Sequence, residues 1–417
     1  MMSDAAAFAL PKVTEWAAGI LLGGATVFTV YQAVKSHHEN YLHTVFAACD
    51  LCNVDKHGHP IPWKIIKRQR LMQGTRYVMA FPLGRTLKDV TDKADALSTA
   101  LGVDVVLGRD GGRLILDVPG APLPTFVMFS PRLLEMTRGR WRTVVGLGAM
   151  DWVIHDFDDR PHLLVAGLTR KGKTTFLANL IATLHLSHGV DDVDLVGIDL
   201  KPRALDFRRF PGVWSKLIDD TDDALNFLVG VREEMYRRAA LLEEVGVRNA
   251  RQYEAVTGEK FRRLFIIVDE FANAAKNEAH GVSIKKELAS ICALGAGFGI
   301  HCILCTQRPD REVVDGQIRA NIGTVLCFQV STDIQSRVVL GKNGAERIPP
   351  IEGRAIYQTD KEEFVQVPIL TDESLRRILP VSGVEYVTEG KVANFTVEEP
   401  VANLEMLGGS KYVRPLN

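Results

Sequence analysis

The stretch HLLVAGLTRKGKTTFLANL, residues 162–180, decides the fold. Its first residues form a short apolar run that is typical of a buried strand, and the residues after Lys173 are typical of a helix. The loop between them has the spacing Gly-x-x-x-x-Gly-Lys-Thr, in which glycines allow backbone N–H groups to surround phosphate oxygens. The sequence therefore predicts a P-loop that opens a helix, whose N-terminus also favours anions.

This loop predicts an ATP site with bound Mg²⁺. Lys173 is expected to reach the β- and γ-phosphates, and the Thr174 hydroxyl is expected to bind Mg²⁺. We predict that nine residues contact the nucleotide: Gly167, Leu168, Thr169, Arg170, Lys171, Gly172, Lys173, Thr174 and Thr175. The alternative, a purely structural glycine loop, does not account for the strand and helix on either side.

A second motif, LFIIVDE at residues 264–270, places two carboxylates after an apolar strand. Ligands bind at the carboxyl edge of sheets of this class. We expect Asp269 to hold Mg²⁺ through water and Glu270 to polarise the attacking water. A third motif, HCILCTQRPD at residues 301–310, brings the Gln307 amide to the same edge, where it would sense the γ-phosphate. A strand-end cap is an equally good interpretation of this third motif.

Five short apolar runs alternate with helical segments from about residue 151 onward. This alternation predicts an α/β fold with a parallel sheet covered on both faces. Before it, residues 63–150 combine strand and helix patterns around an Asp-Gly-Gly turn, which predicts a small α/β domain. The expected organisation is an anchor at residues 1–35, a juxtamembrane segment at 36–62, the small domain at 63–150, the motor at 151–375 and a tail at 376–417.

The composition limits the function classes. Apolar residues make up 46% of the 417 residues and charged ones 24%, as in ordinary folded proteins. The net charge of −1 excludes a global basic signature, so any DNA contact must be a local patch. The six cysteines are too few and too scattered for a disulfide framework.

Residues 16–34, WAAGILLGGATVFTVYQAV, carry no charge and are nearly long enough to cross a bilayer as a helix. Basic residues gather after this segment, which predicts a single-pass protein of the cell membrane with its motor in the cytoplasm. A buried core helix is the alternative.

Seven blocks, in order, carry a resemblance to a known family. They are PHLLVAGLTRKGKTT, IDLKP, EEMYRRAALLEEVGVRN, IIVDEFA, GIHCILCTQRPD, the run from Ile318 to Glu346, and EGRAIY. Together they resemble the FtsK/SpoIIIE family of DNA translocases over about residues 160–360. The resemblance implies a RecA-like fold, a homo-hexameric ring and ATP-driven movement of double-stranded DNA.

Departures from the family narrow the expectation. With one span, no long linker and a short tail, the layout is most similar to TcpA-type coupling proteins, which hand DNA and its relaxase to a type IV secretion channel. The family often carries an arginine just before the strand of the third motif, whereas this chain has LGAGFGIH at residues 294–301. Arg337 matches another family arginine and is the candidate that reaches into the neighbouring subunit's site.

Four residues match family positions that face DNA: Arg308, Arg311, Lys342 and Asn343. Their charged groups would touch phosphates without reading bases. A solvated surface is the alternative for each of them, and Arg203, Arg208 and Arg209 are expected to be structural or to contact another subunit. Cys49, Cys52, His57 and His59 could bind zinc, but their spacing is unusual for a zinc site and ordinary juxtamembrane residues are the favoured interpretation.

The leading functional hypothesis is a membrane-anchored coupling-protein ATPase of conjugation. Alternatives are a double-stranded DNA translocase for segregation or septal transfer, and a protein-secretion ATPase of the type VII kind. The presence of one P-loop disfavours the last, because such chains usually carry several ATPase modules. A nucleotide-binding membrane scaffold without motor activity is disfavoured by the complete set of Lys173, Asp269 and Glu270.

Overall fold

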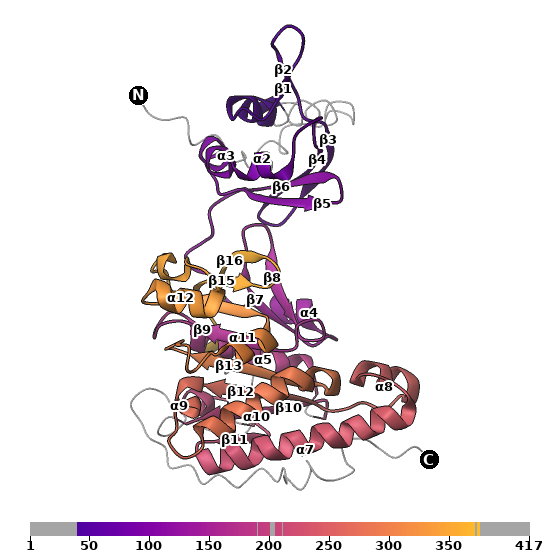
Figure 1. Ribbon diagram of the computed structural model, residues 1–417, viewed down its shortest axis with the longest axis vertical. Helices are drawn as coiled ribbons and strands as arrows, with labels where there is room; N and C mark the ends of the chain where they lie inside the picture. The colour runs from indigo at the N-terminus through magenta and orange to yellow at the C-terminus, as the bar shows by residue number, and fades with distance from the viewer. Residues whose placement is uncertain (1–39, 190, 201–204, 211, 372, 376–417) are drawn as a thin grey trace. The chain divides into compact units, whose positions relative to one another are not determined.

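The computed structural model describes residues 40–189, 191–200, 205–210, 212–371 and 373–375. These residues form two compact units (Figure 1). Unit 1 comprises the chain up to Leu123 together with Ala149–Asp151, and unit 2 comprises Pro124–Gly148 and the chain from Trp152 onward. The predicted span at residues 16–34 and the tail at 376–417 lie outside the described residues. Among the described helices, none is long and apolar enough to cross a membrane.

Unit 1 is built on a four-stranded antiparallel sheet with the order β3-β4-β6-β5. Residues on one face of this sheet alternate with period two, and they include Tyr77, Met79, Leu114 and Leu116. Helices cover that face and share its apolar core. The elements are a helix at residues 40–48, β1 (Asn53–Val54), β2 (Pro60–Ile61), β3 (Ile65–Arg70), β4 (Gly74–Ala80), α2 (Leu87–Thr91), α3 (Ala94–Leu101), β5 (Val106–Asp110) and β6 (Arg113–Pro119).

Unit 2 holds a ten-stranded sheet with the order β11-β10-β12-β13-β9-β14-β15-β16-β7-β8. Its strands are β7 (Arg142–Leu147), β8 (Trp152–Asp156), β9 (Leu163–Ala166), β10 (Val193–Asp199), β11 (Lys216–Ile218), β12 (Arg263–Asp269), β13 (Ile300–Thr306), β14 (Val325–Phe328), β15 (Arg354–Gln358) and β16 (Glu362–Gln366). The six strands from β11 to β14 are parallel. The four from β15 to β8 are antiparallel, so the sheet is mixed and not purely parallel as the sequence predicted.

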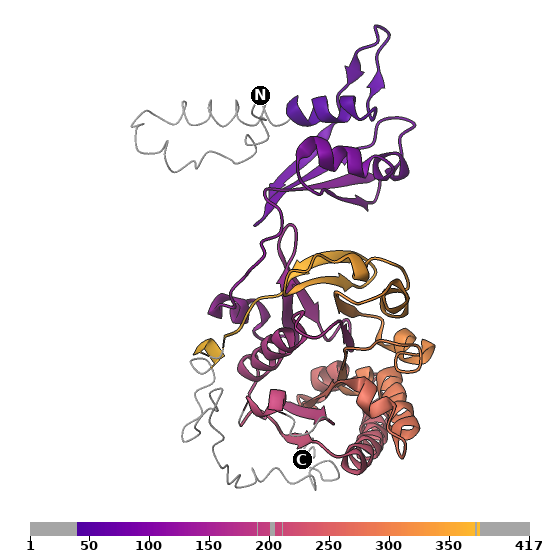
Figure 2. The ribbon, with the colours of Figure 1, turned by 90° about the vertical axis from the view of Figure 1, so that its left-hand side faces the viewer.

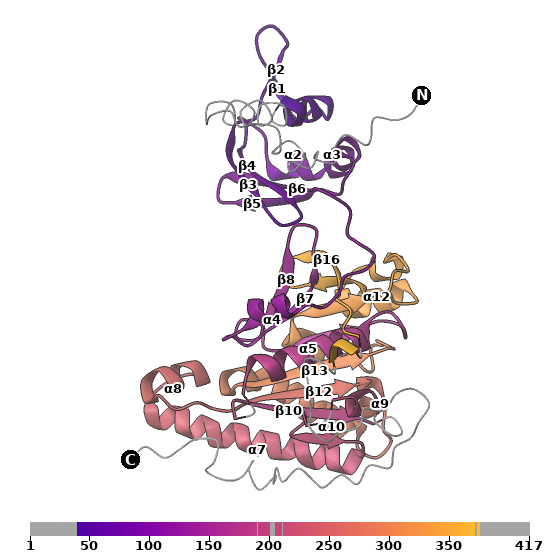
Figure 3. The same ribbon diagram turned by 180° about the vertical axis from the view of Figure 1, so that it is seen from behind.

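Helices cover both faces of this sheet (Figures 1 and 3). One face carries α7 (Thr221–Val245), α9 (Phe271–Ala275), α10 (Gly281–Leu294), α11 (Gly316–Ile322) and α12 (Asp333–Leu340). The other carries α4 (Pro131–Thr137), α5 (Lys173–Ser187) and α6 (Leu205–Arg208). Successive residues of β12 alternate between the two cores, Leu264 and Ile266 on one side and Phe265 and Ile267 on the other. This double burial explains why the strand sequences are almost continuously apolar.

The boundary between the units differs from the predicted one at residue 150. Residues 124–148, with α4 and β7, belong to unit 2, because Leu133, Val144 and Val145 pack in the core beneath α5. Residues 40–62 are also more than a juxtamembrane connector. Phe46, Leu51 and Cys52 are buried in the core of unit 1, so its first helix is part of that domain. The sequence is apolar on both sides of each predicted boundary, so it did not indicate which core these residues join.

Unit 2 contains buried histidines that stay neutral in the folded state. Burial lowers the pKa of His155 to about 3 and that of His162 to about 4. Nδ1 of His155 lies 2.8 Å from the Tyr357 hydroxyl. In the unfolded chain a histidine pKa is about 6.5. The stability contributed by each neutral ring is therefore complete above pH 6.5 and is lost as the pH falls toward the folded-state pKa.

We predict that His155→Asn makes unit 2 less sensitive to acid, because asparagine does not titrate and can still bond the Tyr357 hydroxyl. The free energy of unfolding should fall by about 2 kcal/mol less between pH 7 and pH 5 than in the wild type. Denaturant unfolding at the two pH values measures this difference. The exposed His59→Asn is the control, and equal losses in all three proteins would contradict the prediction.

Candidate ATP site

The site lies where β9, β13 and β12 end at the same edge of the sheet. These three strands are neighbours and parallel, with Thr306 opposite Ala166 and Val268 opposite Leu304. The P-loop follows β9. Thr306 ends β13 and Gln307 comes next, and Asp269 ends β12 and Glu270 comes next. The three sequence motifs are thus brought together by the register of one parallel ladder.

The P-loop lies against the strands beside it. The Leu168 amide donates to the Gln329 carbonyl and the Gly353 amide donates to the Lys171 carbonyl, at 2.9 and 3.0 Å. Gly172 has φ +117°, and a Cβ there would lie 2.7 Å from a ring carbon of Phe328 and 2.9 Å from the Gly353 Cα. The second glycine of the motif is therefore required by both backbone conformation and close packing.

Lys173 begins α5 and turns back across its own loop. Its Nζ donates to the carbonyl oxygens of Gly167 and Leu168, at 2.5 and 2.8 Å. The side chain is only 7% exposed, so these bonds compensate for the burial of its charge. An anion in the loop would offer the ammonium group stronger, charge-assisted bonds than the two neutral carbonyls do.

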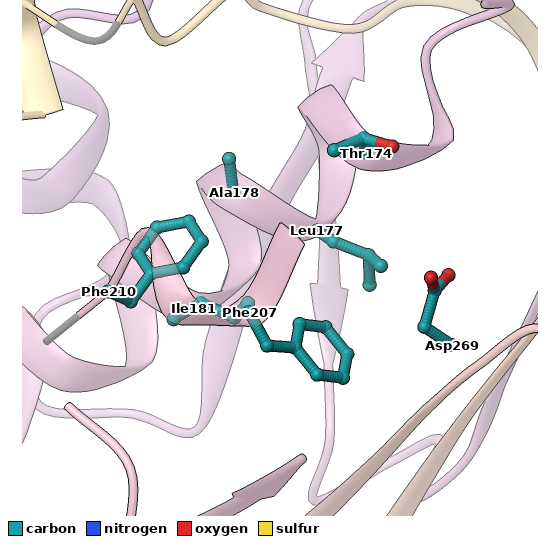
Figure 4. A pocket seen from close by; sticks show the side chains of 7 residues that line it. All are labelled: Thr174, Leu177, Ala178, Ile181, Phe207, Phe210 and Asp269. Atoms are coloured by element: carbon teal, nitrogen blue, oxygen red, sulfur yellow. The ribbon is translucent and has the colours of Figure 1, made fainter. Parts of the chain in front are cut away.

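Thr174 and Asp269 line one small pocket (Figure 4). The Thr174 hydroxyl and the Asp269 carboxylate face the same space, and Leu177, Phe207 and Phe210 form its apolar wall. Hydroxyl and carboxylate oxygens are the ligands that Mg²⁺ prefers. The donor set therefore fits the predicted ion.

Glu270 has an unusual backbone and a fixed carboxylate. It lies in the left-handed region at φ 54° and ψ 64°, just before α9. Non-glycine residues adopt this conformation at a cost, and such outliers concentrate at functional sites. Its carboxylate accepts hydrogen bonds from the Thr306 hydroxyl at 3.2 Å and from the backbone N–H of Gln307 at 3.1 Å. The end of β13 therefore orients Glu270.

Gln307 links the P-loop to this carboxylate. Its side-chain oxygen accepts a 2.6 Å hydrogen bond from the Thr169 hydroxyl, while its backbone N–H donates to Glu270. Gln307 thus directly follows the strand and also contacts the loop. Asp199 was missed by the sequence reasoning. It ends β10 opposite Asp269 and is 2% exposed, and the apolar run VDLVGID ending in aspartate was the available signal.

The predicted DNA-contact residues are exposed on two connections of unit 2. Arg308 and Arg311 lie on the segment after β13, which Asp310 fixes through an ion pair with Lys276 at 2.5 Å. Lys342 and Asn343 lie after α12, and Lys342 Nζ pairs with Glu362 at 2.7 Å.

The other arginines singled out by the sequence lie apart from these two connections. Arg337 lies on α12, where its half-exposed guanidinium pairs with Asp333 at 2.8 Å. Arg208 is exposed and pairs with Asp219, Arg209 is half-buried, and Arg203 lies outside the described residues.

The sequence raised a zinc site that the structure does not assemble. Cys49 and Cys52 are buried in the core of unit 1, whereas His57 and His59 are exposed on the hairpin. Burial raises the pKa of both thiols, which disfavours the thiolate that a metal needs. The four residues are therefore divided between core and surface.

Elsewhere in the described part of the chain, His162, Cys292 and Cys302 lie together with ligand atoms within 4.8 Å. Nδ1 of His162 accepts the Cys302 amide proton at 3.0 Å, so the neutral ring carries its own proton on Nε2. Neither nitrogen then has a free lone pair for an ion. We interpret this cluster as packing between α10 and β13.

Comparisons with known proteins agree with this geometry. Residues 137–326 match the FtsK/SpoIIIE family. A protein named DNA translocase FtsK from Borreliella burgdorferi is 30% identical over 300 residues, which are 66% of this chain and 36% of the relative. Its namesake from Treponema pallidum is 28% identical over 331 residues, 73% and 40% of the two chains. The chain thus spans well under half the length of these curated relatives.

Two solved structures share the fold. The pCW3 conjugation coupling protein TcpA, in a monomer form with ATPγS, has a TM-score of 0.57 at 20% identity and covers 82% of this chain and 98% of its own. The cytoplasmic domain of the type VII secretion ATPase EccC from Thermomonospora curvata has a TM-score of 0.51 at 24% identity and covers 58% and 31%. With its P-loop, its acidic strand end and these family matches, the chain carries an ATPase domain of the FtsK/SpoIIIE family.

Proposed function

We propose that this chain hydrolyses ATP to move DNA, and that it does so as the membrane-anchored coupling protein of a conjugative transfer system. The observation that carries the motor assignment is the link from Thr169 through Gln307 to Glu270, which joins the P-loop to the acidic strand end. A scaffold that only binds nucleotide does not require a carboxylate that is oriented in this way.

Each residue of the site has a proposed part. Lys173 leaves the carbonyls of its own loop to bind the β- and γ-phosphates. Thr174 and Asp269 hold Mg²⁺, which neutralises charge on the phosphates when it is bound. Glu270 polarises the attacking water, and the hydrogen bonds from Thr306 and Gln307 keep its carboxylate in place. Movement of the P-loop on nucleotide binding would reach Glu270 through Thr169 and Gln307.

The DNA-moving unit is proposed to be a homo-hexamer in which Arg337 reaches the neighbouring subunit's nucleotide. For this it must give up its ion pair with Asp333, which is half-exposed and therefore weak. Arg308, Arg311, Lys342 and Asn343 are proposed to contact DNA phosphates. The pairing of Lys342 with Glu362 competes with a phosphate for the same ammonium group.

The coupling role is supported by the structural likeness to TcpA, whose structure the chain covers almost completely. A relaxase and a type IV secretion channel would then be its partners. A double-stranded DNA translocase for segregation or septal transfer is the second candidate, favoured by the identity to proteins named DNA translocase FtsK. Membrane attachment through residues 16–34 remains part of the proposal.

We predict that Lys173→Ala abolishes ATP binding and that Glu270→Gln binds ATP but turns it over slowly. The loss of a positioned carboxylate should reduce the rate by about 10²- to 10⁴-fold. Steady-state hydrolysis and nucleotide-binding titrations measure the two effects. Glu278→Gln, which changes an exposed carboxylate in the segment after α9, should behave as the wild type. Wild-type turnover by Glu270→Gln would refute its role.

The Thr169–Gln307 hydrogen bond gives a test of the proposed link. Thr169→Val and Gln307→Ala should each lower the hydrolysis rate about fivefold, the value of one neutral hydrogen bond, with ATP affinity nearly unchanged. Because the two changes break the same bond, the double variant should be little slower than either single one. Multiplicative losses in the double variant would mean that the two residues act separately.

DNA should stimulate hydrolysis, and Arg308→Ala or Lys342→Ala should reduce this stimulation with the basal rate intact. Each lost phosphate contact should lower the slope of log affinity against log salt by about one. Glu362→Gln should strengthen DNA binding, because it frees Lys342. Arg347→Ala, an exposed cation that pairs with its neighbour Glu346, is the matched control. A rate independent of both single- and double-stranded DNA would reject the motor.

A further inference from the structure

One end of unit 1 exposes apolar side chains on two adjoining turns. Val54 and Ile61 on the β1–β2 hairpin are 64% and 46% exposed, and Leu83 in the turn after β4 is 95% exposed. Asn53 joins the two turns, because it pairs with Ile61 in the hairpin and its side-chain amide donates to the Leu83 carbonyl at 2.9 Å. We call Val54, Ile61 and Leu83 the hairpin end of unit 1. The hairpin projects from the body of the unit in both Figures 1 and 2.

Hydrogen bonds hold the hairpin end in this exposed arrangement. The Arg85 guanidinium donates to the Asn53 side chain at 3.3 Å and to the Cys52 carbonyl at 3.2 Å. Trp63 is buried behind the hairpin and donates to the Leu51 carbonyl at 3.1 Å. Single exposed apolar residues are common, but three on fixed, adjoining, projecting turns mark an interaction surface.

A basic residue follows each apolar side chain of the hairpin end within three positions of the chain. Between residues 56 and 88 the chain carries eight lysines and arginines and no aspartate or glutamate. Lys56, Lys64 and Lys88 in this segment are exposed. The acidic groups at either end of the segment are Asp55 and Asp89. The first accepts the amides of its own turn and the second accepts the Thr86 amide and hydroxyl, so both are engaged locally.

Exposed apolar side chains with exposed lysines close by in the sequence fit the interface of an anionic lipid bilayer. Such surfaces bury apolar groups at the level of the lipid headgroups while basic residues contact the negative surface. Duplex DNA would satisfy the lysines but would offer nothing to Val54, Ile61 and Leu83, because its phosphate backbone is polar and charged. The chemistry of the surface therefore favours lipid over nucleic acid.

The chain's own connection supports the same occupant. The proposed span ends at Val34, and the described part of unit 1 begins at residue 40. The five residues between them extend at most about 20 Å. A bilayer that holds the span is therefore always within reach of unit 1. Only this step rests on the proposed membrane attachment.

We propose that the hairpin end of unit 1 docks onto anionic lipid headgroups as a second membrane contact, separate from the span. Val54, Ile61 and Leu83 enter the interfacial layer, and Lys56 and Lys64 bind lipid phosphates or carboxylates. This contact fixes the orientation of unit 1 on the membrane surface.

A fluorophore on the hairpin tests the contact in the full-length protein. All six native cysteines are buried, so His57→Cys can be labelled selectively with an environment-sensitive dye. The protein is placed in nanodiscs of phosphatidylcholine alone or of an equal mixture with phosphatidylserine. A blue shift of the dye is expected in the anionic discs and should disappear at high salt. The same dye at Met72→Cys, in the turn at the opposite end of the sheet, should not respond.

Variants test the apolar and the basic side chains of this surface separately. Leu83→Glu should abolish the shift, and removing Lys56 and Lys64 together should lower the docked-to-free ratio at least about tenfold, since each lysine near an anionic surface contributes about fivefold. The basal ATPase rate, measured in the same samples, should stay unchanged and reports separately on the proposed motor. If the chain does not insert into discs, the labelled protein should still shift with vesicles of the anionic mixture.

Two results would overturn the proposal. One is a dye signal that is the same in neutral and anionic lipid and insensitive to Leu83→Glu. The other is a shift that appears with duplex DNA and not with lipid, which would make the hairpin end a nucleic-acid surface.

Discussion

The parallel ladder of β12, β13 and β9 aligns the ends of three strands, and the site depends on this alignment. Parallel strands bring their carboxyl ends to one edge, and the register sets Thr306 beside Ala166 and Val268 beside Leu304. From those positions Gln307 reaches Thr169 with its side chain and Glu270 with its backbone. A register shift of one residue would turn these side chains to the opposite face and separate the three motifs.

The P-loop in this structure is held closed by its own groups. Lys173 bonds two carbonyls of the loop, and Gly172 packs against Phe328 and Gly353. Binding of a phosphate must therefore exchange two neutral acceptors for a charged one. The antiparallel strand β15 contributes to this arrangement, since Gly353 directly precedes it and bonds the Lys171 carbonyl. The residue that precedes β15 thus supports the loop, while the four antiparallel strands extend the sheet.

The described residues of unit 1 contribute no side chain to the candidate ATP site. Its helix at residues 40–48 and its sheet enclose a core of their own. The long run without acidic residues lies on β3, β4 and the turns around them. A unit of this kind can orient a motor relative to a charged surface without touching the nucleotide, and the proposed lipid contact at Val54, Ile61 and Leu83 would do so.

The amino-acid sequence by itself determined the P-loop, the acidic strand end and the alternation of strands and helices. These features are local, because each pattern is contained in a few residues. Examples are the spacing of Gly167, Gly172 and Lys173 and the apolar run that ends in Asp269. The family resemblance followed from the same local blocks and is confirmed.

Only the tertiary structure decided which residues lie together across the chain. The Thr169–Gln307 and Gln307–Glu270 bonds join residues far apart in sequence, and no local pattern indicates them. The antiparallel strands β15 and β16 and the assignment of residues 124–148 to unit 2 depend on long-range pairing and on a shared core. Cys49 and Cys52 are a second example of this dependence on tertiary structure. Their spacing suggested a metal, but burial in the core of unit 1 separates them from His57 and His59, because apolar packing decides the side on which each residue lies.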